Sequence, residues 1–225
     1  MNKDLWVVVA AWNEGKKIRE VVGRLIEQYQ NVVVVDDGSQ DNTWLEAHEA
    51  GAWVLRHPVN LGQGAALQTG LTFSIRRGAE FVATFDADGQ HDVADLGRFL
   101  DAIQSRNLEV VIGSRFLGTA TGMKPMRRFM LKAAVIFTRL TTRLDLTDTH
   151  NGLRVFTRAA AAQIAITQNR MAHASQILEQ IAERNLRYAE VPNTIIYTEY
   201  SMAKGQKTSQ FVTVFVDWLM GRIGG

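Results

Sequence analysis

The chain has 225 residues, of which 46% are hydrophobic and 21% are charged, and its formal net charge is +2. This composition is typical of one compact globular domain and excludes a disordered, collagen-like or coiled-coil chain. It gives no reason to expect a nucleic-acid partner, and the absence of cysteine excludes disulfide scaffolds, thiolate metal sites and cysteine nucleophiles.

Short apolar runs alternate with segments of helical periodicity through the first half of the chain. The runs at 5–11, 32–35, 52–55, 81–85 and 110–112 predict buried strands, and the segments 15–29, 43–50, 64–77 and 93–106 predict helices between them. This alternation predicts right-handed βαβ units and an α/β fold with a mainly parallel central sheet flanked by helices. After residue 114 we expect a long helix near 124–144, a helix near 173–184 and short strands around 187–197.

The sequence contains no apolar stretch near the roughly 20 residues that a membrane-spanning helix needs. Its N-terminus also lacks the apolar core and cleavage site of a signal peptide. We therefore expect a cytoplasmic protein whose contact with the membrane, if any, is peripheral and on the cytoplasmic face. For the apolar segment 211–220 we expect packing on the core, with a membrane interface as the alternative.

Polar side chains follow four of the predicted strands. They are Trp12, Asn13 and Glu14 after the first strand, Asp36 and Asp37 after the second, Asp86 and Asp88 after the fourth, and Ser114 and Arg115 after the fifth. The carboxyl ends of parallel strands lie at one edge of a sheet, and ligands of open α/β sheets bind outside that edge. The sequence therefore predicts a ligand site there.

Asp86 and Asp88 flank Ala87 directly after a predicted strand. Residues two apart in an extended chain point the same way, so both carboxylates can meet one ion. Such oxygen ligands favour Mg²⁺ or Mn²⁺, and Gln90 offers a further oxygen. The alternative is an acidic loop in which Asp88 or Asp92 caps the following helix.

Two further loops carry weaker signals. Asp37 can accept hydrogen bonds from a ribose or a base, although an Asp-Gly-Ser sequence is also ordinary turn chemistry. The segment 60–66, which contains Gly62 and Gly64, is neither a dinucleotide fingerprint nor a P-loop. Close packing of a loop at the start of a helix is the expected local explanation for these glycines.

Charge is unevenly distributed along the chain. Residues 36–101 hold eleven acidic and four basic side chains, whereas residues 115–143 hold seven basic and no acidic ones. In the helix expected near 124–144, one face collects Met126, Phe129, Met130, Ala133, Phe137, Leu140 and Leu144, with Arg128, Lys132, Arg139 and Arg143 roughly opposite. This pattern predicts contact with an anionic membrane surface or a phosphate-bearing partner, and a solvated surface is the alternative.

Together, these segments resemble the family 2 glycosyltransferases, and in particular the dolichol-phosphate mannosyltransferase and polyprenyl-phosphate glycosyltransferase group. The resemblance rests on residues 7–14, 34–43, 60–66, 86–91 and 113–116, and it continues through 148–154, 190–192 and 197–206. It implies a GT-A fold over residues 1–225, with a nucleotide-sugar half at 1–114 and an acceptor half at 115–225.

The resemblance further implies an inverting transfer of a hexose from a nucleotide diphosphate sugar, either GDP-mannose or a UDP-sugar. Carried over by position, donor contacts fall on Ala10, Trp12, Glu14, Val35, Asp37, Gly64, Asp86 and Ala87, and ligands of Mg²⁺ or Mn²⁺ on Asp88 and Gln90. The family usually has proline where Ala10 stands and tyrosine where Trp12 stands, which leaves the base of the nucleotide open.

The prediction of the acceptor rests on a pair of residues that related enzymes have and this sequence lacks. Related enzymes often use the Asp of a Glu-Asp pair as general base, but the corresponding segment here, 175–180, contains only Glu179. A phosphate monoester is largely ionised at neutral pH and needs cations instead of a base. The candidate cations are Arg115, Lys124, Arg127, Arg128 and Lys204, and the predicted catalytic residues are Asp86, Asp88, Arg115 and Glu179.

We therefore predict a polyprenyl or dolichyl phosphate acceptor. One alternative is a saccharide or soluble hydroxyl acceptor with Glu179, Asp145 or Asp148 as base. Another is a non-catalytic module that binds nucleotide sugars. The sequence makes no prediction about the oligomeric state.

Overall fold

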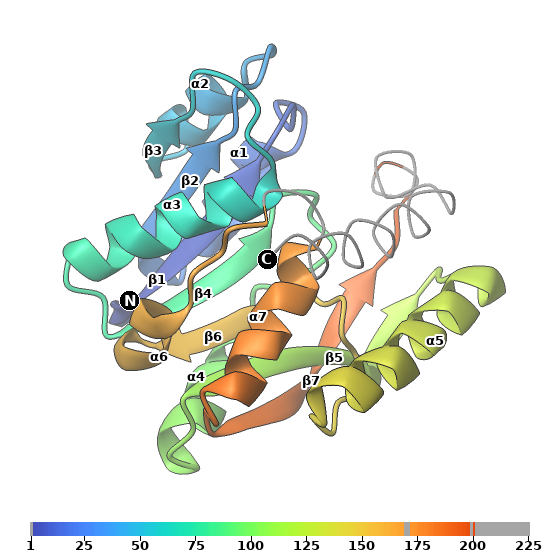
Figure 1. The fold of residues 1–225 in the computed structure, drawn as a ribbon. Helices are drawn as coiled ribbons and strands as arrows, with labels where there is room; N and C mark the ends of the chain where they lie inside the picture. The colour runs from blue at the N-terminus through green and yellow to red at the C-terminus, as the bar shows by residue number, and fades with distance from the viewer. Residues whose placement is uncertain (1, 169–171, 199, 201–225) are drawn as a thin grey trace.

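The computed structural model describes residues 2–168, 172–198 and 200 (Figure 1). Within these residues one sheet runs in the order β3-β2-β1-β4-β6-β5-β7. Its strands are β1 (Asn2–Ala11), β2 (Tyr29–Asp36), β3 (Trp53–Arg56), β4 (Phe81–Asp86), β5 (Val110–Thr121), β6 (Arg154–Thr157) and β7 (Tyr188–Ile196). Strand β6 runs antiparallel to both β4 and β5, and the other neighbours pair in parallel. The predicted α/β class with a mainly parallel sheet is confirmed.

Helices cover both faces of this sheet (Figure 1). They are α1 (Ile18–Ile26), α2 (Thr43–Glu49), α3 (Gln63–Arg76), α4 (Asp95–Ser105), α5 (Pro125–Thr142), α6 (Arg158–Gln163) and α7 (His173–Glu183). Alternate residues of β1 enter different cores, because side chains of a strand point to opposite faces. Val7 packs with α1, α2 and α4, whereas Val8 packs with α3, α6 and α7.

The structure departs from the sequence prediction beyond residue 112. Strand β5 continues to Thr121, so that Ser114 and Arg115 lie inside a strand and not after one. Strand β6 and helix α6 were not predicted, since a four-residue strand that begins with an arginine gives little periodic signal. Among the described residues, no helix combines the length and apolar character needed to cross a bilayer.

The parallel strands bring the predicted ligand-binding edge together. Ala10 near the end of β1 pairs with Val35 of β2 on one side and with Asp86 of β4 on the other. The loops that follow these three strands therefore begin side by side, as expected from their common direction.

Candidate active site

The loops after β1 and β2 are tied to each other by hydrogen bonds. The backbone N–H of Asn13 donates to Ser39 Oγ at 2.8 Å, and that of Glu14 donates to Thr43 Oγ1 at 2.8 Å. Trp12 stands at this edge with 53% of its surface exposed. The sequence-predicted nucleoside residues Ala10, Trp12, Glu14 and Val35 are thus neighbours in space.

Glu14 is buried beneath this loop and has an unforeseen partner. The Tyr200 hydroxyl donates to Glu14 Oε2 at 2.7 Å. Burial and the Glu14 carboxylate raise the pKa of Tyr200 above its usual value, so this hydroxyl stays protonated and donates. A residue from the C-terminal part of the chain therefore helps to hold the first loop.

Asp37 is 2% exposed and organises the neighbouring loop. It accepts hydrogen bonds from the backbone N–H groups of Leu61 at 2.9 Å and Gly62 at 2.7 Å, and its Oδ1 lies 2.7 Å from His57 Nδ1. Next to it, a cavity of about 310 Å³ opens at the ends of β2 and β3, with Ser39 and His57 in its lining. The contact between Asp37 and a nucleoside stays a prediction.

Gly64, at the start of α3, is buried where three chain segments meet. A Cβ atom there would lie 2.1 Å from the carbonyl oxygen of Gln168 and 3.0 Å from Cβ of His173. Close packing therefore requires glycine at this position, as the sequence indicated. The predicted contact between Gly64 and the nucleotide sugar stays a prediction.

Asp86 ends β4 and is held by two side chains. His91 Nε2 lies 2.9 Å from Asp86 Oδ2, and Gln63 Nε2 donates to Oδ1 at 3.4 Å. Burial raises the pKa of Asp86, but the hydrogen bond from His91 and the charges of Arg154 and His173 lower it below its usual value. Asp86 is therefore an ionised carboxylate in a fixed orientation.

Asp88 lies in the same loop, but its surroundings raise its pKa, whereas those of Asp86 lower it. Burial and the charge of Asp86 raise its pKa to about 6, against the hydrogen bond that Gln90 N–H donates to Oδ1 at 3.0 Å. Glu14 adds to this repulsion. A divalent cation would relieve the excess of negative charge, and a carboxylate beside an amide oxygen suits Mg²⁺ or Mn²⁺. In the part of the chain that the structure describes, no three acidic, histidine or cysteine side chains form a ready-made metal cluster.

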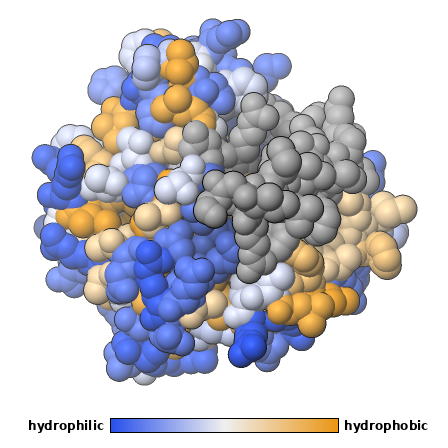
Figure 2. All heavy atoms as spheres, in the orientation of Figure 1, coloured by the Kyte–Doolittle hydropathy of each residue, from blue (hydrophilic) through white to orange (hydrophobic). Residues whose placement is uncertain are grey.

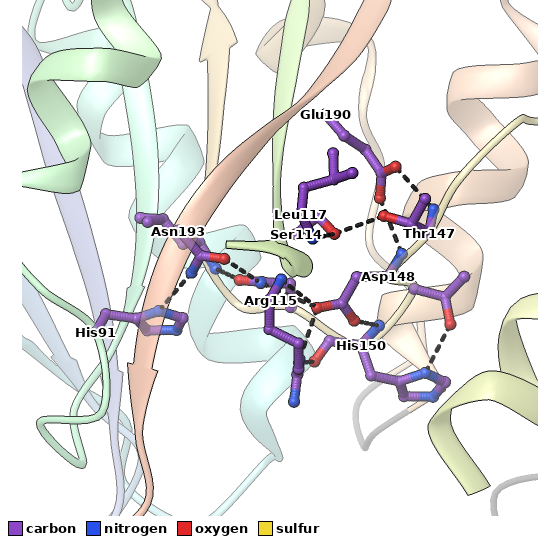
Figure 3. Close-up of polar contacts among 12 residues, drawn as sticks. His91, Ser114, Arg115, Leu117, Thr147, Asp148, His150, Glu190 and Asn193 are labelled. Atoms are coloured by element: carbon purple, nitrogen blue, oxygen red, sulfur yellow. Dashed lines mark hydrogen bonds and ion pairs between the residues drawn. The ribbon is translucent and has the colours of Figure 1, made fainter. Parts of the chain in front are cut away.

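Arg115 lies on the other side of the site and is 5% exposed (Figure 3). Its Nε donates to Asp148 Oδ2 at 2.6 Å, one terminal nitrogen donates to the Tyr197 hydroxyl at 2.7 Å, and the other to the His150 carbonyl. Although burial acts in the other direction, Asp148 and Tyr197 keep the pKa of Arg115 above its usual value. Each guanidinium nitrogen thus has an internal partner, and a direct contact with an acceptor phosphate stays a prediction.

A continuous polar path joins these two ends of the site (Figure 3). From His91, beside Asp86, it runs through Asn193 at 3.3 Å, Asn151 at 3.0 Å and Asp148 at 3.2 Å to Arg115 at 2.6 Å. Because Asn193 Nδ2 donates to His91 Nδ1, the Nε2 of His91 carries the proton that bonds to Asp86. The path fixes the acidic edge of the site relative to its cationic side.

The structure separates the two adjacent arginines of α5. Arg127 is partly buried, and its guanidinium carbon lies 5.0 Å from the centre of the Tyr197 ring, close to Arg115. Arg128 is exposed and, together with Lys132, lines a cavity on the surface of α5. Successive residues of a helix point about 100° apart, which explains the separation. Lys124 lies exposed at the N-cap of α5, and Lys204 lies outside the described residues.

The predicted alternative bases are differently placed. Asp148 is fully buried and accepts from Arg115 and Asn151, so it is already engaged. Asp145 is exposed and pairs with Arg139 at 2.9 Å. Glu179 lies on α7, six residues beyond His173 and hence about 9 Å further along the helix axis. Its role as a base is not tested.

Sequence reasoning missed Arg154, the first residue of β6. It is 1% exposed, pairs with Thr84 of β4 and Ile112 of β5, and its Nε has no hydrogen-bond partner. Burial lowers its pKa to about 10 against the attraction of Asp86 and Asp148. The available signal was a charged residue next to the apolar run 155–156, shortly after Asp148.

Comparisons with known proteins agree with this architecture. The profile of glycosyl transferase family 2 matches residues 6–164. A UDP-N-acetylglucosamine–dolichyl-phosphate N-acetylglucosaminyltransferase of Methanococcus voltae is 31% identical over 99% of this chain and 98% of its own. A polyprenol monophosphomannose synthase of Mycolicibacterium smegmatis is 28% identical over 96% of this chain and 88% of its own.

A solved structure extends the agreement to three dimensions. Glucosyl-3-phosphoglycerate synthase from Mycobacterium tuberculosis, crystallised with Mn²⁺ and UDP-glucose, matches with a TM-score of 0.75 at 17% identity, over 99% of this chain and 80% of that one. This likeness confirms the GT-A fold that the resemblance implied. By its sequence and its fold, the chain belongs to glycosyl transferase family 2.

Proposed function

We propose that this chain transfers a hexose from a nucleotide diphosphate sugar to a polyprenyl phosphate. One named relative is a dolichyl-phosphate N-acetylglucosaminyltransferase and the other a polyprenol monophosphomannose synthase, and each aligns with nearly the whole of this chain. The observation that carries the proposal is the hydrogen-bonded path from His91 to Arg115, which holds an acidic edge and a cationic side in one site. We assign the donor to residues 1–114 and the acceptor to residues 115–225.

At the donor end, the exposed Trp12 offers a stacking face for the base, and the cavity beside Asp37 and His57 receives the nucleoside. Asp86 is kept ionised by His91. Asp88 and Gln90 would hold Mg²⁺ or Mn²⁺. When bound, such an ion neutralises the charge of the departing nucleoside diphosphate.

At the acceptor end, an ionised phosphate oxygen attacks C1 of the sugar while the bond from C1 to the nucleoside diphosphate breaks. No proton has to be removed from a phosphate that is already ionised near neutral pH. Arg127, held over Tyr197, faces this region and would attract the phosphate. Arg115 holds Tyr197 and Asp148 in place, which gives it a positioning role in addition to any direct contact with the acceptor phosphate.

The test is transfer of a labelled sugar into an organic-extractable lipid product. The purified chain is incubated with Mn²⁺, undecaprenyl phosphate in detergent, and GDP-mannose, UDP-glucose or UDP-N-acetylglucosamine. We expect product with at least one donor, none with undecaprenol, which lacks the phosphate, and none from the Asp88→Ala variant. Asp101→Ala, an exposed carboxylate on α4, serves as the matched control and should retain activity.

Two outcomes would overturn the proposal. Equal transfer to undecaprenol or to a free sugar would indicate a hydroxyl acceptor. Binding of nucleoside diphosphates with neither transfer nor hydrolysis of any donor would indicate a binding module.

A further inference from the structure

The two ends of the proposed site are built from different parts of the molecule. At the donor end, the loops after β1 and β4 carry the carboxylates of Glu14 and Asp88. At the acceptor end, Arg115 of β5 and Arg127 of α5 supply positive charge. Figure 2 shows apolar residues gathered at the right of the molecule, where α5 lies in Figure 1. The two ends therefore differ in both charge and polarity.

Tyr197, the residue after β7, belongs to the acceptor end. It is buried, and its backbone N–H donates to the carbonyl oxygen of Thr121 at 3.0 Å. Its hydroxyl accepts a hydrogen bond from Arg115 at 2.7 Å, and the centre of its ring lies 5.0 Å from the guanidinium carbon of Arg127. One tyrosine thus contacts both cations of this end.

Tyr200 lies three positions further along the chain and belongs to the donor end. It is half-buried, and its hydroxyl donates to Glu14 Oε2 at 2.7 Å. Burial and the Glu14 carboxylate raise the pKa of Tyr200, and the charges of Asp41 and Asp88 act in the same direction. These three carboxylates come from the loops after β1, β2 and β4, so each of those loops acts on this hydroxyl.

Other contacts fix the backbone of Glu14. Its N–H donates to Thr43 Oγ1 at 2.8 Å, and its carbonyl oxygen accepts from the N–H groups of Lys17 and Ile18 at 2.8 and 2.9 Å. The Tyr200 hydroxyl therefore acts on the direction of the Glu14 carboxylate and not on the course of the loop.

We propose that Tyr200 is a positioning residue for the nucleotide sugar, acting through Glu14, and that Tyr197 is one for the acceptor phosphate, acting through Arg115. This inference rests on the proposed function and adds to it the side chains that orient its two binding groups. Three residues of chain span at most about 11 Å, so the tyrosine pair also limits the distance between the two ends.

Each hydroxyl acts on a charged group, and such hydrogen bonds are stronger than those between neutral groups. Without the Tyr200 hydroxyl, the ligand itself has to restrict the Glu14 carboxylate, and the cost of this ordering lowers its affinity. Arg115 loses less without the Tyr197 hydroxyl, because it keeps its bonds to Asp148 and to the His150 carbonyl. We therefore expect the larger effect at the donor end.

The first test is calorimetric binding of GDP and of UDP to the full chain with Mn²⁺ and without any acceptor. Tyr200→Phe, which removes one oxygen atom, should weaken binding of the preferred nucleotide about tenfold. Tyr197→Phe should leave this affinity unchanged. The matched control is Tyr29→Phe, a buried tyrosine at the opposite end of β2 from the site, and it should bind like the unaltered chain.

The second test is the KM for undecaprenyl phosphate at a saturating concentration of the sugar donor. Here the order of the two variants should reverse. Tyr197→Phe should raise this KM about threefold, whereas Tyr200→Phe and Tyr29→Phe should leave it unchanged. A role in the fold alone would not divide the two substrates between the two tyrosines.

A double-variant cycle shows whether Tyr200 acts through Glu14. Glu14→Gln should weaken nucleotide binding at least as much as Tyr200→Phe does. If the hydroxyl serves only to direct the Glu14 carboxylate, Glu14→Gln with Tyr200→Phe should bind the nucleotide no more weakly than Glu14→Gln by itself. Losses that add in the double variant would show that Tyr200 acts independently of Glu14.

Thermal melting shows whether each variant is folded. Unchanged nucleotide affinity in Tyr200→Phe, or an equal loss of both substrates in both tyrosine variants, overturns the inference. Nucleotide binding by the unaltered chain without transfer to undecaprenyl phosphate overturns the proposed acceptor and the role of Tyr197, while calorimetry still decides the role of Tyr200. Failure of the unaltered chain to bind either nucleotide overturns the proposed function and this inference together.

Discussion

The backbone at Gly152 passes directly against the carboxylate of Asp86. A Cβ atom at this position would lie 2.2 Å from Asp86 Oδ2, well inside van der Waals contact. The segment that connects Asp148 to β6 therefore fits against the Asp86 carboxylate only because residue 152 has no side chain. The Asp86 carboxylate is set between this backbone and His91.

Gly152→Ala should displace Asp86 and lower turnover by about tenfold to a hundredfold, the scale of a misplacement near 1 Å. Gly97→Ala in α4 is the matched control, because a Cβ there meets nothing within 4 Å. It should leave turnover unchanged and stabilise the helix by up to about 1 kcal/mol. Steady-state kinetics and thermal melting measure both effects, and normal turnover by Gly152→Ala would contradict the proposed importance of the Asp86 position.

Asp148→Asn should destabilise the fold by about 3 kcal/mol, because it leaves the buried Arg115 without its counter-charge. At about 2–4 °C per kcal/mol, the melting temperature should fall by roughly 6–12 °C. The double variant Arg115→Met with Asp148→Leu should lose less unfolding free energy than the sum of the losses in Arg115→Met and Asp148→Leu measured separately. Strict additivity would show that the two side chains are not coupled.

Arg154 should matter for activity more than for stability. Replacing Arg154 by Met removes the cost of burying a guanidinium whose Nε is unbonded, which offsets the lost attraction to Asp86 and Asp148, so the free energy of unfolding should fall by less than in Asp148→Asn. It also removes a positive charge that lowers the pKa of Asp86, so the acid limb of the rate profile should move to higher pH. Arg154→Lys should restore the original profile. A melting temperature that falls with an unmoved pH profile would give Arg154 a purely structural role.

The half-buried His150 should make the protein sensitive to acid. Burial lowers its pKa to about 4 from 6.5, with the charges of Arg115, Arg154 and Arg127 acting in the same direction against Asp148. The unfolded chain therefore binds the proton first, and stability present above pH 6.5 is lost as the pH falls towards 4, by up to about 3 kcal/mol. His150→Gln should flatten this part of the curve of unfolding free energy against pH. An unchanged slope would contradict the assignment.

Asp88 should have the opposite dependence in the metal-free protein. Its pKa is raised from 3.8 to about 6, so its contribution to stability decreases as the pH rises through this window. Asp88→Asn should therefore raise the melting temperature of the metal-free protein at pH 7.5, by about 2–4 °C for each kcal/mol gained. The same variant should lose the stabilisation that Mn²⁺ gives to the unaltered chain. A retained response to Mn²⁺ would contradict the proposed role of Asp88 as a metal ligand. The pH dependence due to His150 is best measured in the Asp88→Asn background, where Asp88 no longer titrates.

The local features of the proposed donor end could be read from the sequence. Asp86 and Asp88 are near neighbours in the chain, and the alternation of strands and helices places the ends of β1, β2 and β4 at one edge. These inferences depend on periodicity and on the common direction of parallel strands, which are properties of short segments. They required no knowledge of which distant residues meet.

The structure of the proposed acceptor side depends on contacts between residues that are distant in the sequence. The sequence showed seven basic residues between 115 and 143 but not that Arg115 is buried against Asp148, or that Arg127 and Arg128 diverge. Strand β6 exists because β4 and β5 pair with it on both sides, and its four residues give almost no signal alone. Helical periodicity likewise revealed an apolar face on α5 but not its direction. Only the packing of Leu131 and Val135 decided that this face points outward, because burial is a property of the assembled fold and not of a segment.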